Sequence, residues 1–141
     1  MENSLNRTNI MSILPHRGNM LLLDEAYLLE GKAHGIYRIR GDEWFLDGHF
    51  PGNPVVPGVI LCEILAQSAC VLLEGRIEEG ATPYFAGISE ARFKEPVKPG
   101  DTVETECEII KSKGPFYFAS GKVFVGTRLC AKAEFSFAVM A

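Results

Sequence analysis

The chain lacks an excess of basic residues. Its 14 Lys and Arg residues are outnumbered by 18 Asp and Glu, which gives a formal net charge of -4 at pH 7. Proteins that bind nucleic acids need clustered cations to neutralise the phosphates, so this composition argues against such a role. It favours a protein that acts on a small molecule or on another protein.

The sequence also lacks a long uninterrupted hydrophobic run. The longest run, from Val59 to Leu73, is broken by Glu63, Gln67 and Ser68, so it is not typical of a membrane-spanning helix. The N-terminal segment from Met1 to Arg7 is polar, where a signal peptide has an apolar core. We therefore expect a cytoplasmic protein that is neither exported nor inserted in a membrane.

Metal-binding cysteine patterns are missing from the chain. The four cysteines form no Cys-x-x-Cys pair and have no histidine close by in sequence: Cys62, Cys70, Cys107 and Cys130. We therefore expect no zinc site and no other metal centre. Isolated thiols of this kind are typical of small apolar core residues in a reducing compartment.

Repeats, low-complexity segments and linker-like clusters of Gly and Pro are absent as well, so we assign residues 1–141 to one domain. Hydrophobic residues make up 47% of the chain. A chain of this length buries roughly 68% of the surface of its unfolded state, which is enough for one compact core.

Hydrophobic patterning predicts one long helix and about six strands. The helix runs from Gly58 to about Arg76 and is apolar on nearly every side, so it must be enclosed. A short helix is expected from Thr8 to Leu14, just before Pro15. The fold class is therefore α+β, with an antiparallel sheet wrapped around a central helix. The predicted strands are Met20–Leu29, Ala33–Arg40, Tyr84–Lys94, Thr102–Ile109, Phe116–Val125 and Leu129–Ala138.

One carboxylate lies inside the long apolar helix. The neighbours of Glu63 would strip water from it, and an unpaired carboxyl group in such surroundings is a candidate proton donor. Gln67 lies one turn further on, on the same face, and could hold the carboxyl group by a hydrogen bond. Alternatively, Glu63 simply reaches solvent or a subunit interface.

The start of this helix offers free backbone donors. Pro57 precedes it, so the amide groups of Gly58 and Val59 have no acceptor inside the helix. Such amides, together with the helix dipole, can stabilise an oxygen that gains negative charge. Ordinary helix initiation after a proline would give the same sequence.

A histidine precedes the helix in a loop that is rich in proline and glycine. The prolines restrict the backbone after His49 and would aim its imidazole, which can accept a proton at neutral pH. A lone loop histidine is often structural or simply exposed. The other two histidines, His16 and His34, have no visible catalytic partner in the sequence, and we expect both to be structural.

Together these features resemble a known family. The run GHFPGNPVVPGV at 48–59, followed by Glu63 and by Ala66-Gln67, is similar to the signature of the FabZ-type β-hydroxyacyl-acyl-carrier-protein dehydratases. Pro15-His16-Arg17 and the segment 20–24 resemble the N-terminal motif of that family, and the segments 86–88, 91–94, 96–97 and 99–101 resemble its later motif. The resemblance covers nearly the whole chain in order and spacing.

The resemblance implies a hot-dog fold, a homodimer that can assemble further into a hexamer, and no cofactor. It implies dehydration of (3R)-3-hydroxyacyl-[acyl-carrier-protein] to the trans-2-enoyl product in the fatty acid elongation cycle, with acyl carrier protein as partner. Each site would combine His49 of one subunit with Glu63 of the other. Glu63 would then be at an interface and functional as well.

The same resemblance implies a role for each residue. His49 would accept the C2 proton, the Gly58 amide would stabilise the thioester oxygen, and Glu63 would protonate the departing hydroxyl. Residue chemistry alone would allow His49 and Glu63 to exchange these duties. Three alternatives stay open: a hot-dog acyl thioesterase, a dehydratase that also isomerises the enoyl double bond, and a carrier-binding subunit with a silent site.

Further residues are candidates for binding the acyl chain and its carrier. Phe50 could line the acyl channel, and Tyr84 aligns with the loop that gates this channel in the resembled family. Arg92, Lys94 and Lys98 could form a basic rim that docks an acidic carrier protein. A solvated strand face would carry the same charges.

Overall fold

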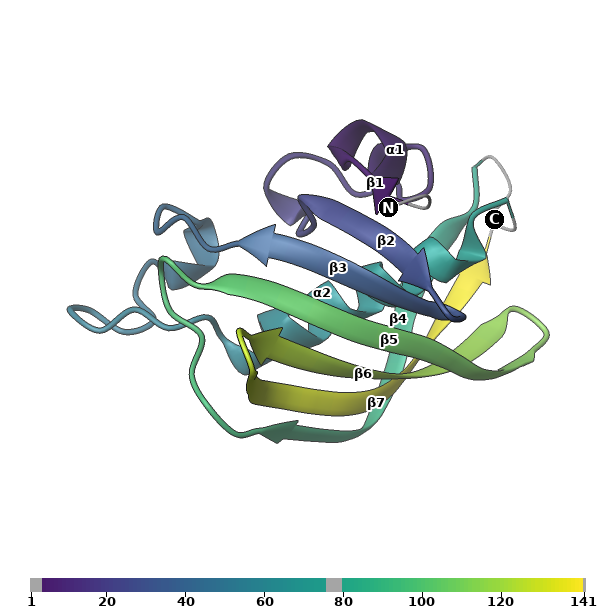
Figure 1. Cartoon of the computed structure of the whole chain (residues 1–141). Coiled ribbons are helices and arrows are strands. Elements are labelled where there is room, and N and C mark those ends of the chain that lie inside the picture. The colour runs from purple at the N-terminus through teal and green to yellow at the C-terminus, as the bar shows by residue number, and fades with distance from the viewer. Residues whose placement is uncertain (1–3, 76–79, 141) are drawn as a thin grey trace.

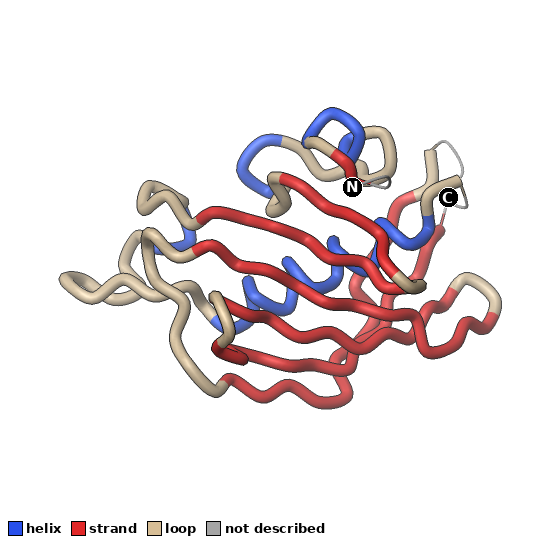
Figure 2. Tube along the Cα trace, viewed as in Figure 1, coloured by secondary structure: helices blue, strands red, loops and turns tan. Residues whose placement is uncertain are grey.

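The structure is a computed structural model that describes residues 4–75 and 80–140. Its strands form one antiparallel sheet in the order β1-β2-β3-β5-β6-β7-β4 (Figures 1 and 2). The sheet curves around one long helix, α2 (Gly58–Cys70), as a hot-dog fold requires. The strands are β1 (Ser4–Leu5), β2 (Glu25–Leu29), β3 (Lys32–Arg38), β4 (Thr82–Phe93), β5 (Thr102–Lys113), β6 (Phe116–Val125) and β7 (Arg128–Met140).

The helix is enclosed as its sequence predicts. All residues of α2 from Ile60 onward are buried except Glu63. The helix ends at Cys70 and continues as a short 3-10 helix over Val71–Leu73, so it is shorter than predicted. The predicted end near Arg76 lies outside the described residues.

The sheet also agrees with the prediction apart from its first strands. β6 spans the predicted residues, and the alternation in β5 buries Val103 and Cys107 while Glu104 and Glu108 face solvent. The described residues contain seven strands, because Ser4–Leu5 adds a short edge strand that has no sequence pattern of its own.

The N-terminal third departs most from the prediction. The short helix α1 spans Arg7–Met11 and starts at an Asn6–Asn9 capping box, earlier than the predicted Thr8. The strand predicted from Met20 begins only at Glu25. The backbone at Met20 is in a 3-10 turn, and its carbonyl bonds a helix side chain instead of a strand.

A row of small residues lets α2 approach the sheet closely. Added Cβ atoms show how little room is left: at Gly121 such an atom would lie 2.9 Å from a methyl carbon of Leu65 on the helix. Large side chains in this row would push the helix away and open voids, which are costly in a packed core. The row crosses five strands and consists of Ala33, Cys107, Gly121, Ala133 and Ala91.

The polar groups under the helix are paired in a chain of hydrogen bonds. The Gly35 amide donates to Thr105 Oγ1 at 2.8 Å, the Thr105 hydroxyl donates to Ser68 Oγ at 2.8 Å, and the Ser68 hydroxyl donates to the Ile64 carbonyl at 2.8 Å. Each donor in this chain has an acceptor, so hydrogen bonds offset the desolvation cost of these buried polar atoms.

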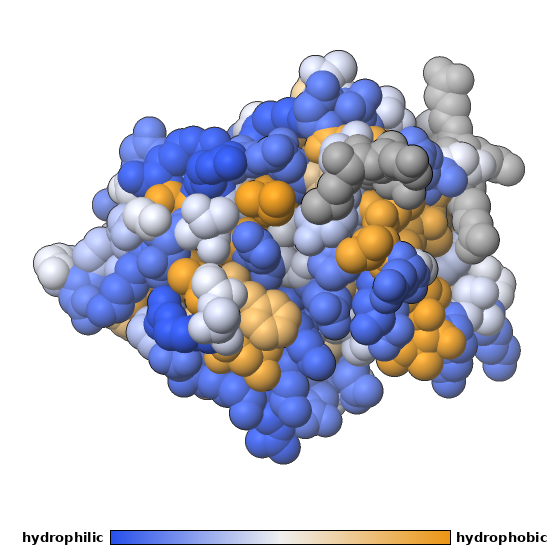
Figure 3. All heavy atoms as spheres, viewed as in Figure 1, coloured by the Kyte–Doolittle hydropathy of each residue, from blue (hydrophilic) through white to orange (hydrophobic). Residues whose placement is uncertain are grey.

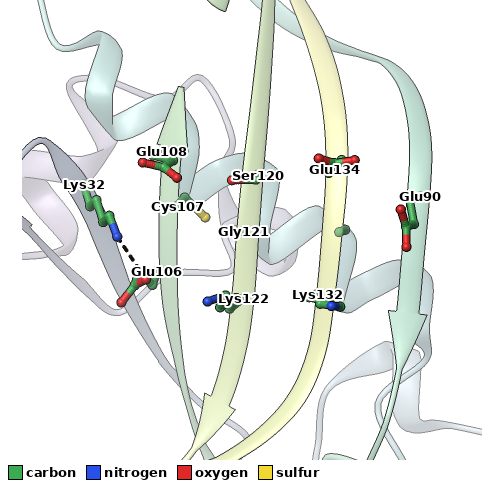
Figure 4. Close-up of a pocket in the computed structure, with 11 residues that line it drawn as sticks. Lys32, Glu90, Glu106, Cys107, Glu108, Ser120, Gly121, Lys122, Lys132 and Glu134 are labelled. Carbon is green, nitrogen blue, oxygen red and sulfur yellow. Dashed lines mark hydrogen bonds and ion pairs between the residues drawn. The ribbon is translucent and has the colours of Figure 1, made fainter. Parts of the chain in front are cut away.

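The outer face of the sheet is largely hydrophilic, with hydrophobic patches between the charged residues (Figure 3). A hollow of about 270 Å³ on this face is lined by lysines and glutamates, with Lys32 Nζ 3.4 Å from Glu106 Oε1 (Figure 4). Opposite charges neutralise one another here, as on an ordinary solvated strand face. Neither His49 nor Glu63 lines this hollow.

We expect Gly35→Ala to destabilise the protein. The new Cβ would lie 2.5 Å from Ser68 Oγ and 2.9 Å from Thr105 Oγ1, both of which are held in the buried hydrogen-bond chain. The expected loss is about 1–3 kcal/mol of unfolding free energy, measured by urea denaturation. Gly87→Ala is the matched control, because its Cβ would meet only Ser136 Oγ at 3.5 Å. Equal urea midpoints for both variants would contradict the close approach of helix and sheet.

Candidate functional site

The loop before α2 fixes which nitrogen of His49 can accept a proton. His49 Nδ1 lies 3.0 Å from the carbonyl oxygen of Val55, and the Val55 amide donates to the His49 carbonyl at 2.8 Å. A carbonyl can only accept, so Nδ1 carries the hydrogen and Nε2 keeps its lone pair. The ring also stacks on Phe50 with centroids 4.2 Å apart. His49 is thus held with a free basic nitrogen.

His49 borders an apolar groove of about 490 Å³ at the start of α2. The groove runs between the loop before the helix and the chain just after β4. Its walls are mostly hydrophobic, so it can accept an extended apolar chain. The lining residues are His49, Val55, Val56, Gly58, Val59, Leu61, Phe93, Lys94, Glu95, Pro96 and Val97.

The first turn of α2 presents free amide groups at this groove. Pro57 caps the helix, and among the described residues neither the Gly58 amide nor the Val59 amide donates a hydrogen bond. Val59 is 71% exposed. The ring of Phe93 packs where a Gly58 side chain would begin, with ring carbons 2.8–3.1 Å from an ideal Cβ. The glycine therefore makes room for Phe93, and the helix start remains able to bind an anionic oxygen.

Glu63 lies one and a half turns further along α2 and keeps 23% of its side chain exposed. The hydrogen bond expected from Gln67 is present, with Gln67 Nε2 2.9 Å from Glu63 Oε2. Gln67 itself is almost fully buried, and its amide also bonds the backbone at Met20 and Leu22. Glu63 is thus hydrogen-bonded to a Gln67 side chain that the backbone holds in place.

The structure also places His16 beside Glu63, which the sequence analysis missed. His16 Nε2 lies 3.4 Å from Glu63 Oε2, and a cavity of about 40 Å³ adjoins both side chains together with Gln67, Cys70 and Phe85. No partner for His16 is visible in the sequence, and the structure places Glu63 next to it. Glu63 lies far from His16 in the sequence. The only sequence signal that His16 has a fixed position is the Pro-His-Arg motif that contains it.

His49 and Glu63 line different cavities within this chain. The 490 Å³ groove contains His49, Gly58 and Val59, whereas Glu63 and Gln67 belong to the small cavity with His16. The chain therefore presents the candidate residues in two separate groups, one at the start of α2 and one further along it.

The remaining predicted site residues lie on or near the edge strand β4. Tyr84 is 57% exposed and lines neither cavity. Arg92 pairs with Glu90, with 2.8 Å between Nε and Oε1, and lies opposite Lys132 on β7. Lys94 lines the His49 groove, and the exposed Lys98 lies in the following turn.

The described cysteines are buried and free. Burial raises the pKa of the Cys62, Cys107 and Cys130 thiols above its usual value. Burial also raises the pKa of the Cys70 thiol, and the nearby Glu63 carboxylate raises it further. These thiols stay protonated and act as apolar groups. The described segments contain no group of three or more His, Cys, Asp or Glu side chains placed to hold a metal ion.

Comparison with known proteins identifies the family. The model of the FabA-like domain matches residues 14–134. The chain is 42% identical to a 3-hydroxyacyl-[acyl-carrier-protein] dehydratase FabZ from Caldicellulosiruptor saccharolyticus, over 94% of this chain and 96% of the relative. It is 44% identical to the protein of the same name from Moorella thermoacetica, over 92% of this chain and 93% of that one.

Solved structures share the fold. The dehydratase heterocomplex ApeI:P from Xenorhabdus doucetiae superposes with a TM-score of 0.80 at 17% identity, over 94% of this chain and 91% of that one. The fluoroacetyl-CoA thioesterase FlK reaches a TM-score of 0.67 at 13% identity, over 77% of this chain and 86% of that one. The hot-dog fold thus holds both dehydratases and thioesterases, so it does not by itself define a reaction. The sequence identity to FabZ proteins does distinguish between dehydratases and thioesterases, and the chain belongs to the FabA-like family as a member of its FabZ-type dehydratases.

Proposed function

We propose that this chain, as one domain over residues 1–141, dehydrates (3R)-3-hydroxyacyl-[acyl-carrier-protein] to the trans-2-enoyl product in the fatty acid elongation cycle. The observation that carries the proposal is the His49 loop, in which one ring nitrogen is held by Val55 and the other is free to accept a proton. We place the reaction in the cytoplasm. Within residues 4–75 and 80–140, every helix falls short of the length and hydrophobicity that a membrane-spanning segment needs.

Proton removal begins at C2 of the substrate. His49 Nε2 takes this proton, and the electron pair moves toward the thioester carbonyl. The growing negative charge on the thioester oxygen needs donors that are already in place. The free amides of Gly58 and Val59 supply them at the positive end of the α2 dipole.

Loss of the hydroxyl completes the reaction. The C3–O bond breaks as Glu63 delivers a proton to the departing oxygen, which leaves as water. The C2–C3 double bond forms, Glu63 becomes a carboxylate and His49 an imidazolium. Transfer of the proton from His49 back to Glu63, through solvent or directly, restores the starting state.

The proposed site needs two copies of the chain. His49 and Glu63 line different cavities in one chain, and β4 is the last strand of the sheet that the described residues form. Exposed edges with apolar side chains tend to pair with another strand. Pairing of two copies through β4 would bury the exposed apolar side chains of this strand and bring His49 of one copy to Glu63 of the other. A hexamer built from such dimers stays a prediction. The exposed apolar residues of β4 are Tyr84, Phe85, Ile88 and Phe93.

The acyl chain would enter along the apolar groove beside His49. Phe50 stacks on His49 and would contact the substrate near the reacting carbons. Tyr84 projects from the edge that would form the dimer, so it would close the channel from the partner's side. No metal or cofactor enters any step.

The partner that carries the substrate would dock near the mouth of this groove. Lys94 lines the groove, and Arg92 and Lys98 lie close to it in sequence. Carrier proteins are acidic, so a basic rim would steer them toward the site.

Replacing either reacting group should abolish the dehydration. We expect His49→Ala and Glu63→Gln to lower kcat by about 10²–10⁴-fold, the usual contribution of a general acid or base. Enoyl absorbance from 3-hydroxyacyl thioesters measures the reaction, and size-exclusion chromatography shows that the variants still fold and assemble. Wild-type rates in either variant would rule out the mechanism, and release of free thiol by the wild type would indicate a thioesterase instead.

Mixing the two inactive variants should restore activity if each site spans two chains. In a random mixture half of the dimers contain one intact site, so the expected activity is about a quarter of the wild-type value. The control replaces Glu63→Gln by the double variant His49→Ala/Glu63→Gln, which cannot form an intact site with His49→Ala. A mixture as inactive as its components, despite subunit exchange, would contradict the shared site.

Charge reversal of the basic rim should weaken carrier docking. We expect Arg92→Glu together with Lys98→Glu to lower kcat/KM several-fold for carrier-bound substrates and to flatten its salt dependence. A carrier-free thioester should react as before. Lys113→Glu, on the distant hairpin between β5 and β6, is the control. Unchanged kinetics with the carrier-bound substrate would place the docking surface elsewhere.

A further inference from the structure

Two side chains approach the same oxygen of Glu63. Gln67 Nε2 lies 2.9 Å from Glu63 Oε2, and His16 Nε2 lies 3.4 Å from the same atom. Within residues 4–75 and 80–140, no hydrogen bond or ion pair reaches Glu63 Oε1. The two oxygens of this carboxyl group therefore have different surroundings.

The orientation of the Gln67 amide is fixed by the backbone. Its Oε1 accepts a hydrogen bond from the Leu22 amide at 2.9 Å, and its Nε2 donates to the Met20 carbonyl at 2.8 Å. A flipped amide would set donor against donor and acceptor against acceptor. Gln67 must therefore present an N–H to Glu63, so Oε2 has to be an acceptor in every protonation state of the pair. A proton on Glu63 then belongs on Oε1.

The surroundings of His16 select its tautomer. Its Nδ1 is buried and is the one buried side-chain nitrogen or oxygen without a hydrogen-bond partner in the described part of the chain. A hydrogen on Nδ1 would be an unpaired buried donor, whereas a hydrogen on Nε2 points toward Glu63 Oε2. The neutral ring with hydrogen on Nε2 therefore fits best. It is the opposite tautomer to that of His49.

The backbone around His16 is held in place from the other side. The guanidinium of Arg17 donates to the carbonyls of His16 and Leu14, both at 2.7 Å, and to that of Met11 at 2.9 Å. The Pro-His-Arg motif thus combines a side chain aimed at Glu63 with an arginine that fixes the turn carrying it. Such preorganisation is what a positioning residue needs.

We propose that His16 is a positioning residue that, together with Gln67, occupies Glu63 Oε2 and thereby makes Oε1 the oxygen that carries the transferable proton. The inference rests on the proposed function, in which Glu63 is the proton donor. The separation of 3.4 Å is longer than a usual hydrogen bond, so in this structure His16 faces Glu63 Oε2 at ion-pair distance.

The other groups around this pair carry no competing charge. The cavity between His16 and Glu63 is otherwise lined by apolar side chains, by Gln67 and by the Cys70 thiol. The raised pKa of Cys70 keeps that thiol protonated. His16 is therefore the titratable partner that faces Glu63 within this cavity.

Nitrogen-15 spectra of histidine-labelled full-length protein test the tautomer directly. The chain has three histidines, so His16→Gln and His34→Gln variants assign every signal. We expect His16 to be protonated on Nε2 and bare on Nδ1, with His49 showing the reverse pattern as an internal reference. A hydrogen on Nδ1 of His16, alone or with one on Nε2, would overturn the proposal.

Kinetics of two His16 variants test the role. His16→Leu removes the donor at similar size, and we expect kcat to fall about tenfold with KM nearly unchanged, as for the loss of one hydrogen bond made in the transition state. His16→Gln places an amide N–H near the position of Nε2 and should retain most of the activity. His34→Leu controls for removing a histidine elsewhere. A wild-type kcat in His16→Leu, or equal losses in both His16 variants, would overturn the proposal.

The two experiments separate this inference from the proposed function. The spectra do not depend on activity, so a wild type that fails to dehydrate would overturn the function while leaving the tautomer measurable. An active enzyme with the wrong His16 tautomer would overturn only the positioning role. If His16→Leu does not fold, the spectra and His16→Gln still decide.

Discussion

The enclosure of α2 by the sheet is the constraint on which the rest of the structure depends. The helix approaches the strands so closely that Gly35 and Gly121 have no room for a side chain. Polar groups on its buried faces cannot reach water, so each must find a partner in the protein. Ser68 finds one through Thr105 and the Ile64 carbonyl, and Gln67 finds two in the backbone at Met20 and Leu22. Enclosure thereby turns side chains that would be mobile on a surface helix into fixed groups.

The same enclosure separates the two ends of the helix chemically. At the N-terminal end Pro57 opens α2 toward an apolar groove, and the Gly58 amide remains free. Two turns later the Gln67 amide bonds the backbone at Met20 and Leu22 and holds Glu63 by a further hydrogen bond. The N-terminal end of α2 thus offers backbone amides that have no acceptor among the described residues. The later part offers the Glu63 carboxyl group, of which only one oxygen is in hydrogen-bond or ion-pair contact with other side chains of the described residues. An elimination needs both kinds of group at one substrate, which is why our proposed site draws on two copies of the chain.

Local sequence signals predicted the parts of the fold in which neighbours along the chain decide the structure. Pro57 marks the start of α2 correctly, and the alternation from Phe116 to Val125 predicts β6 without error. Long-range pairing explains the failures. The segment at Met20 has the composition of a strand, yet its backbone bonds Gln67. The contact of His16 with Glu63 depends on the same distant packing, so no spacing in the sequence could reveal it. The sequence named the candidate residues His49, Gly58 and Glu63 and predicted the bond from Gln67 to Glu63, but it did not reveal the contact of His49 with Val55.

The direction of the hydrogen bonds around His49 and Glu63 favours one assignment of the base and acid roles, which the residue types alone leave open. A histidine and a glutamate can each act as acid or base. His49 donates its Nδ1 hydrogen to a carbonyl that cannot give one back, so its neutral ring has only a lone pair to offer the substrate. Gln67 presents a donor to Glu63 Oε2 with a polarity that the backbone at Met20 and Leu22 fixes, so a proton on Glu63 stays on the oxygen that faces away from these donors. The proposed roles, His49 as the base at C2 and Glu63 as the acid at C3, are thus compatible with the backbone contacts at Val55 and at Met20–Leu22 that orient these side chains.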